Sequence, residues 1–235
     1  MIISLTGFMG CGKSSVGRKL SELLCCRFMD LDDWIEAEAG CTISEIFSQQ
    51  GEAEFRKLEQ NTLKDILDSY GRGLVIPMTP VFATLGHPLA GGGMSSPSSS
   101  APATEPNQVS GQDHSEDTSK TNVEAVLALG GGAVMTAGSE EIVHEGTVCI
   151  YLKASVDTLI EHLSGETAGR PLLSNQTVMS SEVETSPLRA RILELMSLRA
   201  ETYERTAHLI IETDGKTVEE VAAEIVAKIA QQPNI

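Results

Sequence analysis

The stretch Gly7-Phe8-Met9-Gly10-Cys11-Gly12-Lys13-Ser14 decides the fold of this chain. It matches the phosphate-binding pattern G-x-x-x-x-G-K-[ST], and it lies between an apolar run at 2–5 and helical spacing at 16–24. Glycines let the backbone curl so that successive N–H groups point inward and cradle phosphate oxygens, and the helix that follows adds its positive end. The stretch therefore predicts a phosphate-binding loop between a buried strand and a helix.

Two side chains of this loop have predicted roles. We expect Lys13 to reach the β- and γ-phosphates of a nucleotide and the Ser14 hydroxyl to ligate Mg²⁺. Cys11 stands between glycines, and its simplest interpretation is an inert filler position. A glycine turn that matches the pattern by coincidence is the alternative.

Working outward, the apolar patterns alternate between strand-like runs and helical spacing. The predicted strands are 2–5, 26–29, 126–129, 148–152 and 208–211, and the predicted helices are 16–24, 42–47, 52–69, 155–163, 188–203 and 217–230. Alternation of this kind predicts an α/β fold with a parallel sheet flanked by helices.

Two polar stretches interrupt the pattern. Residues 91–122 hold 15 Gly, Pro or Ser among 32 residues and contain no Phe, Trp or Tyr, so they cannot bury enough apolar surface to offset the entropy of ordering. We predict a disordered insert over about 72–122 within one domain, 1–235, with the apolar piece 74–89 either a displaced strand fragment or a lead-in. Residues 164–186 are predicted to form a mobile lid.

Composition excludes several classes of function. The formal charge of −16 disfavours nucleic-acid and anionic-membrane partners, which need a basic surface. No apolar run approaches the ~18 residues of a spanning helix. Five cysteines without a C-x-x-C spacing argue against a disulfide framework or a zinc ribbon, so we expect a reduced, cytoplasmic protein. Cys25, Cys26 and Cys149 are predicted to be core thiols.

Asp30-Leu31-Asp32 lies at the carboxyl end of the second predicted strand, the edge where open α/β sheets bind ligands. Alternation along an extended chain would point both carboxylates toward the phosphate loop. One could hold the water shell of a metal while the other accepts a proton from a substrate hydroxyl. A solvated acidic turn is the alternative.

Three arginines are further candidates. Arg56 and Arg199, on two predicted helices, would suit a carboxylate substrate if they converge on one pocket, because the guanidinium fork matches that geometry; surface salt bridges are the alternative. Arg170, in the polar stretch, could close over a γ-phosphate. The glycines at 130–132 directly follow a buried strand and are the more promising of two such runs.

Six motifs in order resemble the shikimate kinase family. They are G-F-M-G-C-G-K-S-S-x-G at 7–17, D-L-D-D at 30–33, E-F-R-K-L-E at 54–59, L-G-G-G-A-V at 129–134, R-P-L-L at 170–173 and L-M-S-L-R-A-E-T-Y at 195–203. The resemblance implies a phosphate-loop kinase of the nucleoside-monophosphate-kinase type with a five-stranded parallel sheet. It also implies transfer of the ATP γ-phosphoryl group to the 3-hydroxyl of shikimate, in chorismate biosynthesis. We expect the protein to be a monomer.

The resemblance also implies a role for each matching residue. The ATP-binding residues are Gly10, Cys11, Gly12, Lys13, Ser14, Ser15 and Arg170, and the Mg²⁺ ligands are Ser14 and, through water, Asp30. The shikimate-binding residues are Asp32, Arg56, Gly131 and Arg199. Asp32 is the candidate base, so the catalytic set is Asp32, Lys13 and the lid residue Arg170.

Two departures from the family pattern and two alternatives accompany this prediction. The insert interrupts the chain just before the glycine run, and Glu161-His162-Leu163 lacks the adenine-stacking arginine of the family, a role that His162 could fill. The alternatives are another small phosphate-loop kinase, such as a gluconate or nucleotide kinase, and a nucleotide-binding module that the insert has inactivated.

Overall fold

A computed structural model describes residues 1–71, 123–163 and 185–231 of the chain. The predicted insert lies outside the described residues, as does all of the predicted lid except its last two residues. The strands are β1 (Ile2–Thr6), β2 (Arg27–Asp30), β3 (Ala125–Ala128), β4 (Val148–Lys153) and β5 (Leu209–Glu212). The helices are α1 (Lys13–Leu23), α2 (Leu31–Ala39), α3 (Ile43–Gln50), α4 (Glu52–Gly71), α6 (Ser139–Gly146), α7 (Val156–Leu163), α8 (Thr185–Thr206) and α9 (Val218–Gln231), with a 3₁₀ turn η1 (Ala133–Met135).

The strands form one five-stranded sheet in the order β2-β3-β1-β4-β5, and every neighbouring pair is parallel. This confirms the predicted fold class. Leu5 of β1 and Asp30 of β2 both align with Ala128 of β3. Because parallel strands end at the same edge, the segments that follow β1, β2 and β3 meet there.

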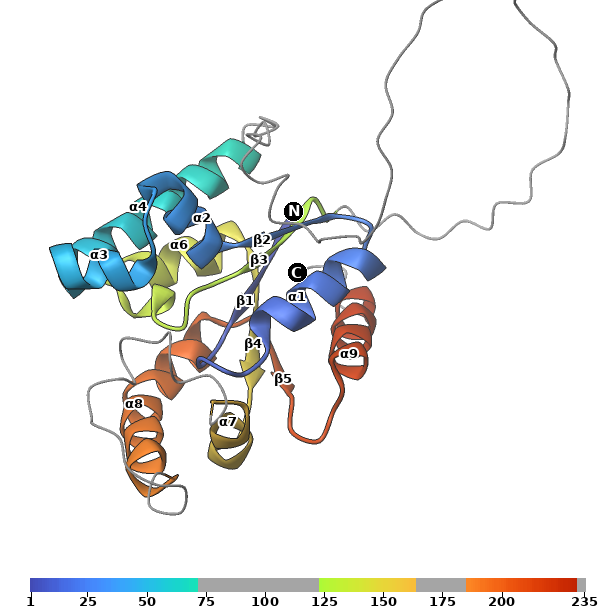
Figure 1. Cartoon of the computed structure of the whole chain (residues 1–235). Helices are drawn as coiled ribbons and strands as arrows, with labels where there is room; N and C mark the ends of the chain where they lie inside the picture. The colour runs from blue at the N-terminus through green and yellow to red at the C-terminus, as the bar shows by residue number, and fades with distance from the viewer. Residues whose placement is uncertain (72–122, 164–184, 232–235) are drawn as a thin grey trace, which may run out of the picture. The chain divides into compact units, whose positions relative to one another are not determined.

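Side chains alternate between the two faces of the sheet and build two cores. Ile3 and Leu5 of β1 face one core, which α1, α7 and α9 cover, whereas Ile2 faces the other, which α2, α4 and α6 cover. Figure 1 shows α1 beside α9, apart from the group of α2, α3, α4 and α6. With both faces covered, β1 and β3 are buried along their whole length and are mainly apolar, as the sequence predicted. No helix within the described ranges is long and apolar enough to cross a bilayer.

The prediction of a core thiol is wrong for Cys25 and holds only in part for Cys26, which packs against the edge of one core. Cys25 is exposed and Cys26 only partly buried, whereas Cys149 in β4 is buried as predicted. The cause is the turn that ends α1: Cys25 adopts a φ of 50°, and the N–H groups of Cys25 and Cys26 donate to the carbonyls of Glu22 (3.3 Å) and Ser21 (3.0 Å). This left-handed closure points the Cys25 side chain to solvent.

Helices α2 and α6 were not predicted from the apolar pattern. For α2 the missed signal is its capping. Asp30 accepts a hydrogen bond from the Asp32 N–H, and Gly40 closes the helix in the left-handed conformation with φ 67°. The predicted alternation of Asp30 and Asp32 along an extended chain is therefore wrong: Asp30 ends β2, and Asp32 lies in the first turn of α2.

Candidate active site

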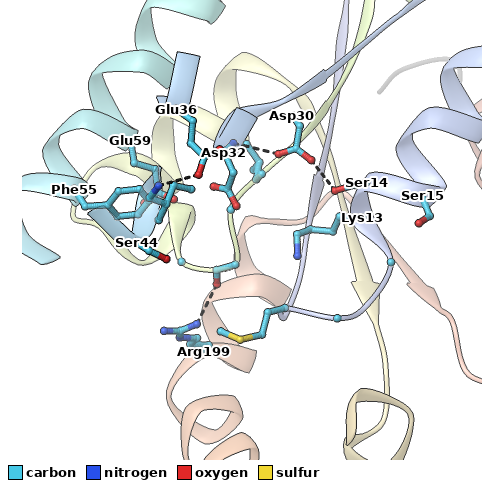
Figure 2. A pocket seen from close by; sticks show the side chains of 18 of the residues that line it. Lys13, Ser14, Ser15, Asp30, Asp32, Glu36, Ser44, Phe55, Glu59 and Arg199 are labelled. Carbon is cyan, nitrogen blue, oxygen red and sulfur yellow. Dashed lines mark hydrogen bonds between the residues drawn. The ribbon is translucent and has the colours of Figure 1, made fainter. Parts of the chain in front are cut away.

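A pocket of about 770 Å³ opens at the carboxyl ends of β1, β2 and β3. Its walls come from the phosphate loop and α1, from the start of α2, from α3 and α4, from the glycines after β3, and from α7 and α8. In Figure 2, Lys13 and Ser14 lie on one side, Phe55 and Glu59 on the other, and Asp32 between them. This is the edge at which open α/β sheets bind their ligands.

The phosphate loop is shaped by its own backbone. Gly12 has a φ of 91° immediately before α1, a conformation that favours glycine. The Lys13 Nζ donates to the carbonyls of Gly7 and Phe8, both at 3.0 Å, so the lysine ties the loop together. The side chain of Cys11 is buried in the core beneath the loop, which leaves only its backbone to contact a phosphate.

Ser14 and Asp30 join the first helix to the second strand. The Ser14 hydroxyl donates to Asp30 Oδ2 at 2.6 Å, and Asp30 Oδ1 accepts from the Asp32 N–H at 3.1 Å. A hydroxyl and a carboxylate side by side form an all-oxygen donor set of the kind that suits Mg²⁺. The described residues hold no group of three or more His, Cys, Asp or Glu that could bind a metal by themselves. A protein that supplies one or two oxygens and leaves the rest to phosphates and water fits Mg²⁺ well.

Asp32 has an unusual charge environment. Burial, followed by the nearby carboxylates of Asp30 and Glu59, raises the pKa of Asp32 to about 7, and Lys13 opposes this rise. An acid with a pKa near 7 can accept a proton and release it again at neutral pH. Asp32 is therefore chemically suited to act as a general base toward a hydroxyl in this pocket.

Arg56 reaches the pocket from the first turns of α4. Its Nη1 lies 2.7 Å from Glu59 Oε2 and its Nη2 lies 3.2 Å from Glu52 Oε1. The guanidinium also packs on the glycine run: a Cβ at Gly132 would lie 2.6 Å from Arg56 Nη2. Any larger residue at 132 would have to displace the guanidinium of the arginine.

Glu59 belongs to the same wall, although the sequence indicated it only as a neighbour of Arg56. Its side chain is 2% exposed, and its Oε1 is buried without a hydrogen-bond partner. Burial raises the pKa of Glu59, and Arg56 and Arg199 oppose that rise. A buried acceptor without a partner is costly, so the unpaired Oε1 is a destabilising feature of this wall. The spacing of Arg56 and Glu59, three residues apart on one helix, was the signal that could have identified it.

The second arginine comes from α8. Arg199 Nη1 donates to the Gly131 carbonyl at 3.3 Å, and the Tyr203 hydroxyl donates to the same oxygen. The Arg199 guanidinium also lies 5.9 Å from the centre of the Phe8 ring. Arg56 and Arg199 thus both line one pocket and pack against consecutive glycines, as the clamp prediction requires.

His162, at the end of α7, lines the pocket and contacts the phosphate loop. Its Nδ1 lies 2.8 Å from the Gly10 carbonyl. Because a carbonyl only accepts, this contact needs the tautomer with a proton on Nδ1. His162 therefore borders the phosphate-binding side of the pocket.

Comparison with known sequences identifies the family. The sequence profile of shikimate kinase matches residues 9–80 and 112–230. The chain belongs to the shikimate kinase family. The shikimate kinases of Thermus thermophilus and Chlorobium chlorochromatii are 31% and 29% identical to it, over 97% of this chain and 89% and 90% of their own lengths. This membership makes the protein a kinase, a phosphotransferase.

Solved shikimate kinases share the fold. The enzyme from Acinetobacter baumannii, solved in complex with shikimate, has a TM-score of 0.67 and 25% identity over 100% of this chain and 95% of its own. The enzyme from Bacteroides thetaiotaomicron has a TM-score of 0.66 at 22% identity, over 100% of this chain and 99% of its own. At 22% identity, the similarity to the Bacteroides thetaiotaomicron enzyme supports the fold alone.

Most of the residues expected from the resemblance to shikimate kinases line this one pocket. They are Gly10, Gly12, Lys13, Ser14, Ser15, Asp30, Asp32, Arg56, Gly131 and Arg199. Cys11 differs, since its side chain faces the core. Arg170 lies outside the described residues. The Gly131 carbonyl already accepts hydrogen bonds from Arg199 and Tyr203 of α8. A substrate contact from Gly131 would therefore come from its N–H group.

Proposed function

We propose that this chain transfers the γ-phosphoryl group of ATP to the 3-hydroxyl of shikimate, giving 3-phosphoshikimate and ADP, as a step of aromatic amino-acid biosynthesis. The observation that carries the proposal is the placement of Asp32, with its pKa near 7, between the phosphate loop and a pair of arginines. This arrangement combines a phosphate donor site, a base and a carboxylate site in one pocket.

Shikimate is a ring carboxylic acid with several hydroxyls, and the acceptor side of the pocket matches that chemistry. We assign its carboxylate to Arg56 and Arg199, whose planar forks bind carboxylates bidentately. The Gly131 N–H supplies a backbone contact. Asp32 receives the ring hydroxyls on the side that faces the phosphate loop.

ATP occupies the side formed by the phosphate loop. The N–H groups of residues 10–15 surround its phosphates, and the positive end of α1 favours their charge. Lys13 exchanges its bonds to the loop carbonyls for the β- and γ-phosphate oxygens. We assign the closing arginine to Arg170 in the predicted lid.

Mg²⁺ fits beside these residues, with Ser14 as a direct ligand and Asp30 holding a metal-bound water. When bound, the ion screens the negative charge of the β- and γ-phosphates. The hydrogen bond from Ser14 to Asp30 orients both oxygens toward this position. The protein residues hold the donor phosphates in line with the acceptor hydroxyl.

The bonds and protons of the transfer are accounted for by the two substrates and Asp32. The acceptor oxygen forms a bond to the γ-phosphorus while the bond from that phosphorus to the β,γ-bridging oxygen breaks, and ADP leaves. Asp32 takes the proton of the hydroxyl. Since phosphoryl transfer needs little covalent chemistry from the protein, positioning and charge stabilisation supply most of the rate.

A coupled assay of ADP release tests this function with shikimate, gluconate and AMP as separate acceptors. We expect saturable, Mg²⁺-dependent turnover with shikimate alone. Turnover with gluconate or AMP and not with shikimate would make the chain a different small kinase. Tight ATP binding without turnover on any acceptor would instead make it a nucleotide-binding module.

We further propose that the protein works as a cytoplasmic monomer without a nucleic-acid or membrane partner. Sedimentation velocity at micromolar concentration should give a single species of about 25 kDa. A stable dimer would contradict the proposal.

A further inference from the structure

Tyr203 contacts the acceptor side of the pocket through the carbonyl of Gly131. It is fully buried in α8, and its hydroxyl donates to the carbonyl of Gly131. Arg199, one helical turn earlier on the same face of α8, donates to the same oxygen at 3.3 Å. One carbonyl of the glycine run is thus held by both a buried tyrosine and an arginine of the proposed carboxylate clamp.

The tyrosine itself is rigidly held. Its ring stacks on Tyr151 of β4, with ring centres 5.2 Å apart and planes inclined by 30°, and Tyr151 is 1% exposed. Burial raises the pKa of the Tyr203 hydroxyl above its usual range, so the group stays a hydrogen-bond donor at neutral pH. The hydroxyl therefore lies at a fixed point defined by the central sheet.

The glycine run needs such a fixed point. Residues 130–132 have no side chains and the greatest backbone freedom of any residue type, yet they pack closely against Asp32, Glu59 and Arg56. A Cβ at Gly130 would lie 2.8 Å from Asp32 Oδ1 and 2.6 Å from Glu59 Oε1. A shift of the Gly131 peptide would move the Gly131 N–H and the anchor of Arg199 together.

We propose that Tyr203 is a positioning residue of the acceptor site: its hydroxyl fixes the Gly131 carbonyl and thereby holds the glycine run and Arg199 in the geometry that receives the substrate carboxylate. This inference rests on the proposed function for the identity of the acceptor. Tyr203 lies behind the glycine run and does not touch the substrate. Replacing Tyr203 should therefore change the binding of the acceptor and leave the binding of ATP unchanged.

The test compares Tyr203→Phe with Tyr151→Phe. Each variant removes one hydroxyl from the same ring stack, but Tyr151 forms no hydrogen bond to the glycine run within the part of the chain that the structure describes. For Tyr203→Phe we expect the KM for shikimate to rise about three- to tenfold, the effect of one lost hydrogen bond, while the KM for ATP stays within about twofold of wild type. Tyr151→Phe should leave both KM values within about twofold.

A purely structural hydroxyl would give another result. Tyr203→Phe would then lower the melting temperature but leave the KM for shikimate as Tyr151→Phe does, and this outcome overturns the proposal. Equal increases in both KM values would overturn it as well, because they would indicate general damage to the pocket.

A second measurement works without an acceptor. Hydrogen–deuterium exchange of residues 129–135 in the free protein should be faster in Tyr203→Phe than in Tyr151→Phe. If wild-type protein fails to phosphorylate shikimate, the proposed function has failed, and the exchange result alone then decides the positioning. Equal exchange in the two variants would overturn it whatever the acceptor is.

Discussion

Arg56 and Glu59, one turn apart on α4, form an ion pair of 2.7 Å in the wall of the pocket, with the Glu59 side chain only 2% exposed. An exposed pair of this spacing would contribute little, but here burial strengthens the attraction. The pair holds the guanidinium against Gly132 before any substrate arrives. Arg56 is therefore oriented in advance, which reduces the entropy lost on binding.

Replacing Arg56 tests the carboxylate clamp. We predict that Arg56→Ala raises the KM for shikimate at least about tenfold, because a buried charge-assisted bond to the substrate is worth about 2–5 kcal/mol. The KM for ATP should change little, since the phosphate loop lies on the other side of the pocket. Steady-state kinetics with each substrate varied in turn measures both values. An unchanged KM for shikimate would place the clamp on another residue.

Replacing Glu59 tests the orientation of that arginine. Glu59→Gln keeps the shape but removes the charge that holds Arg56, so we predict a KM for shikimate several-fold above wild type. Glu52→Gln is the matched control. Glu52 also contacts Arg56, at 3.2 Å, but its side chain is 55% exposed, and its loss should change the KM less than about twofold. Similar effects of the two variants would show that the burial of Glu59 does not matter.

Asp32→Asn should separate activity from stability. We predict that turnover nearly disappears while ATP binding, measured by calorimetry, survives. The folded protein holds a proton on Asp32 up to a pKa of about 7, above the ordinary value of 3.8. The folded state therefore binds more protons than the unfolded state between these values, and stability falls as the pH rises through that window.

The amide removes this penalty, so Asp32→Asn should raise the melting temperature at pH 8 more than at pH 5. Asp33→Asn is the control, since the next carboxylate is more than half exposed in its pair with Arg18. It should keep most of the activity. Near-normal turnover in Asp32→Asn would remove Asp32 from the mechanism.

A stacked histidine pair far from the pocket predicts a loss of stability in acid. The rings of His144 and His208 lie 4.3 Å apart with an 8° tilt, and His208 Nδ1 accepts the Cys149 N–H at 3.1 Å. Burial, followed by the charge of His144, lowers the pKa of His208. Its contribution to stability is therefore complete above about pH 6.5, the unfolded value, and is lost as the pH falls through the lower folded value.

The variant His208→Asn retains an acceptor but cannot be protonated. Thermal melts from pH 7.5 to 5 should therefore show a smaller acid-induced drop in His208→Asn than in wild type. Identical slopes in wild type and His208→Asn would show that this pair does not sense pH.

The sequence by itself determined the local elements and the phosphate-donor half of the site. The loop at 7–14 and the apolar residues on either side of it are neighbours in the sequence. The β1–loop–α1 unit therefore followed from residue spacing alone. Residue spacing also predicted the apolar strands, which helices cover on both faces of the sheet. The resemblance of six ordered motifs then indicated the family and the acceptor residues Asp32, Arg56, Gly131 and Arg199.

Only the tertiary structure decided how these pieces meet. Ser14 bonds to Asp30 across 16 positions, and Arg199 and Tyr203 reach Gly131 across 68 and 72; no local pattern encodes such distances. The burial that raises the pKa of Asp32 and isolates one oxygen of Glu59 arises where α2, α4 and the glycine run converge. The charge and hydrogen bonding of a pocket residue depend on its neighbours in space. In this protein those neighbours come together only when β3 pairs between β2 and β1.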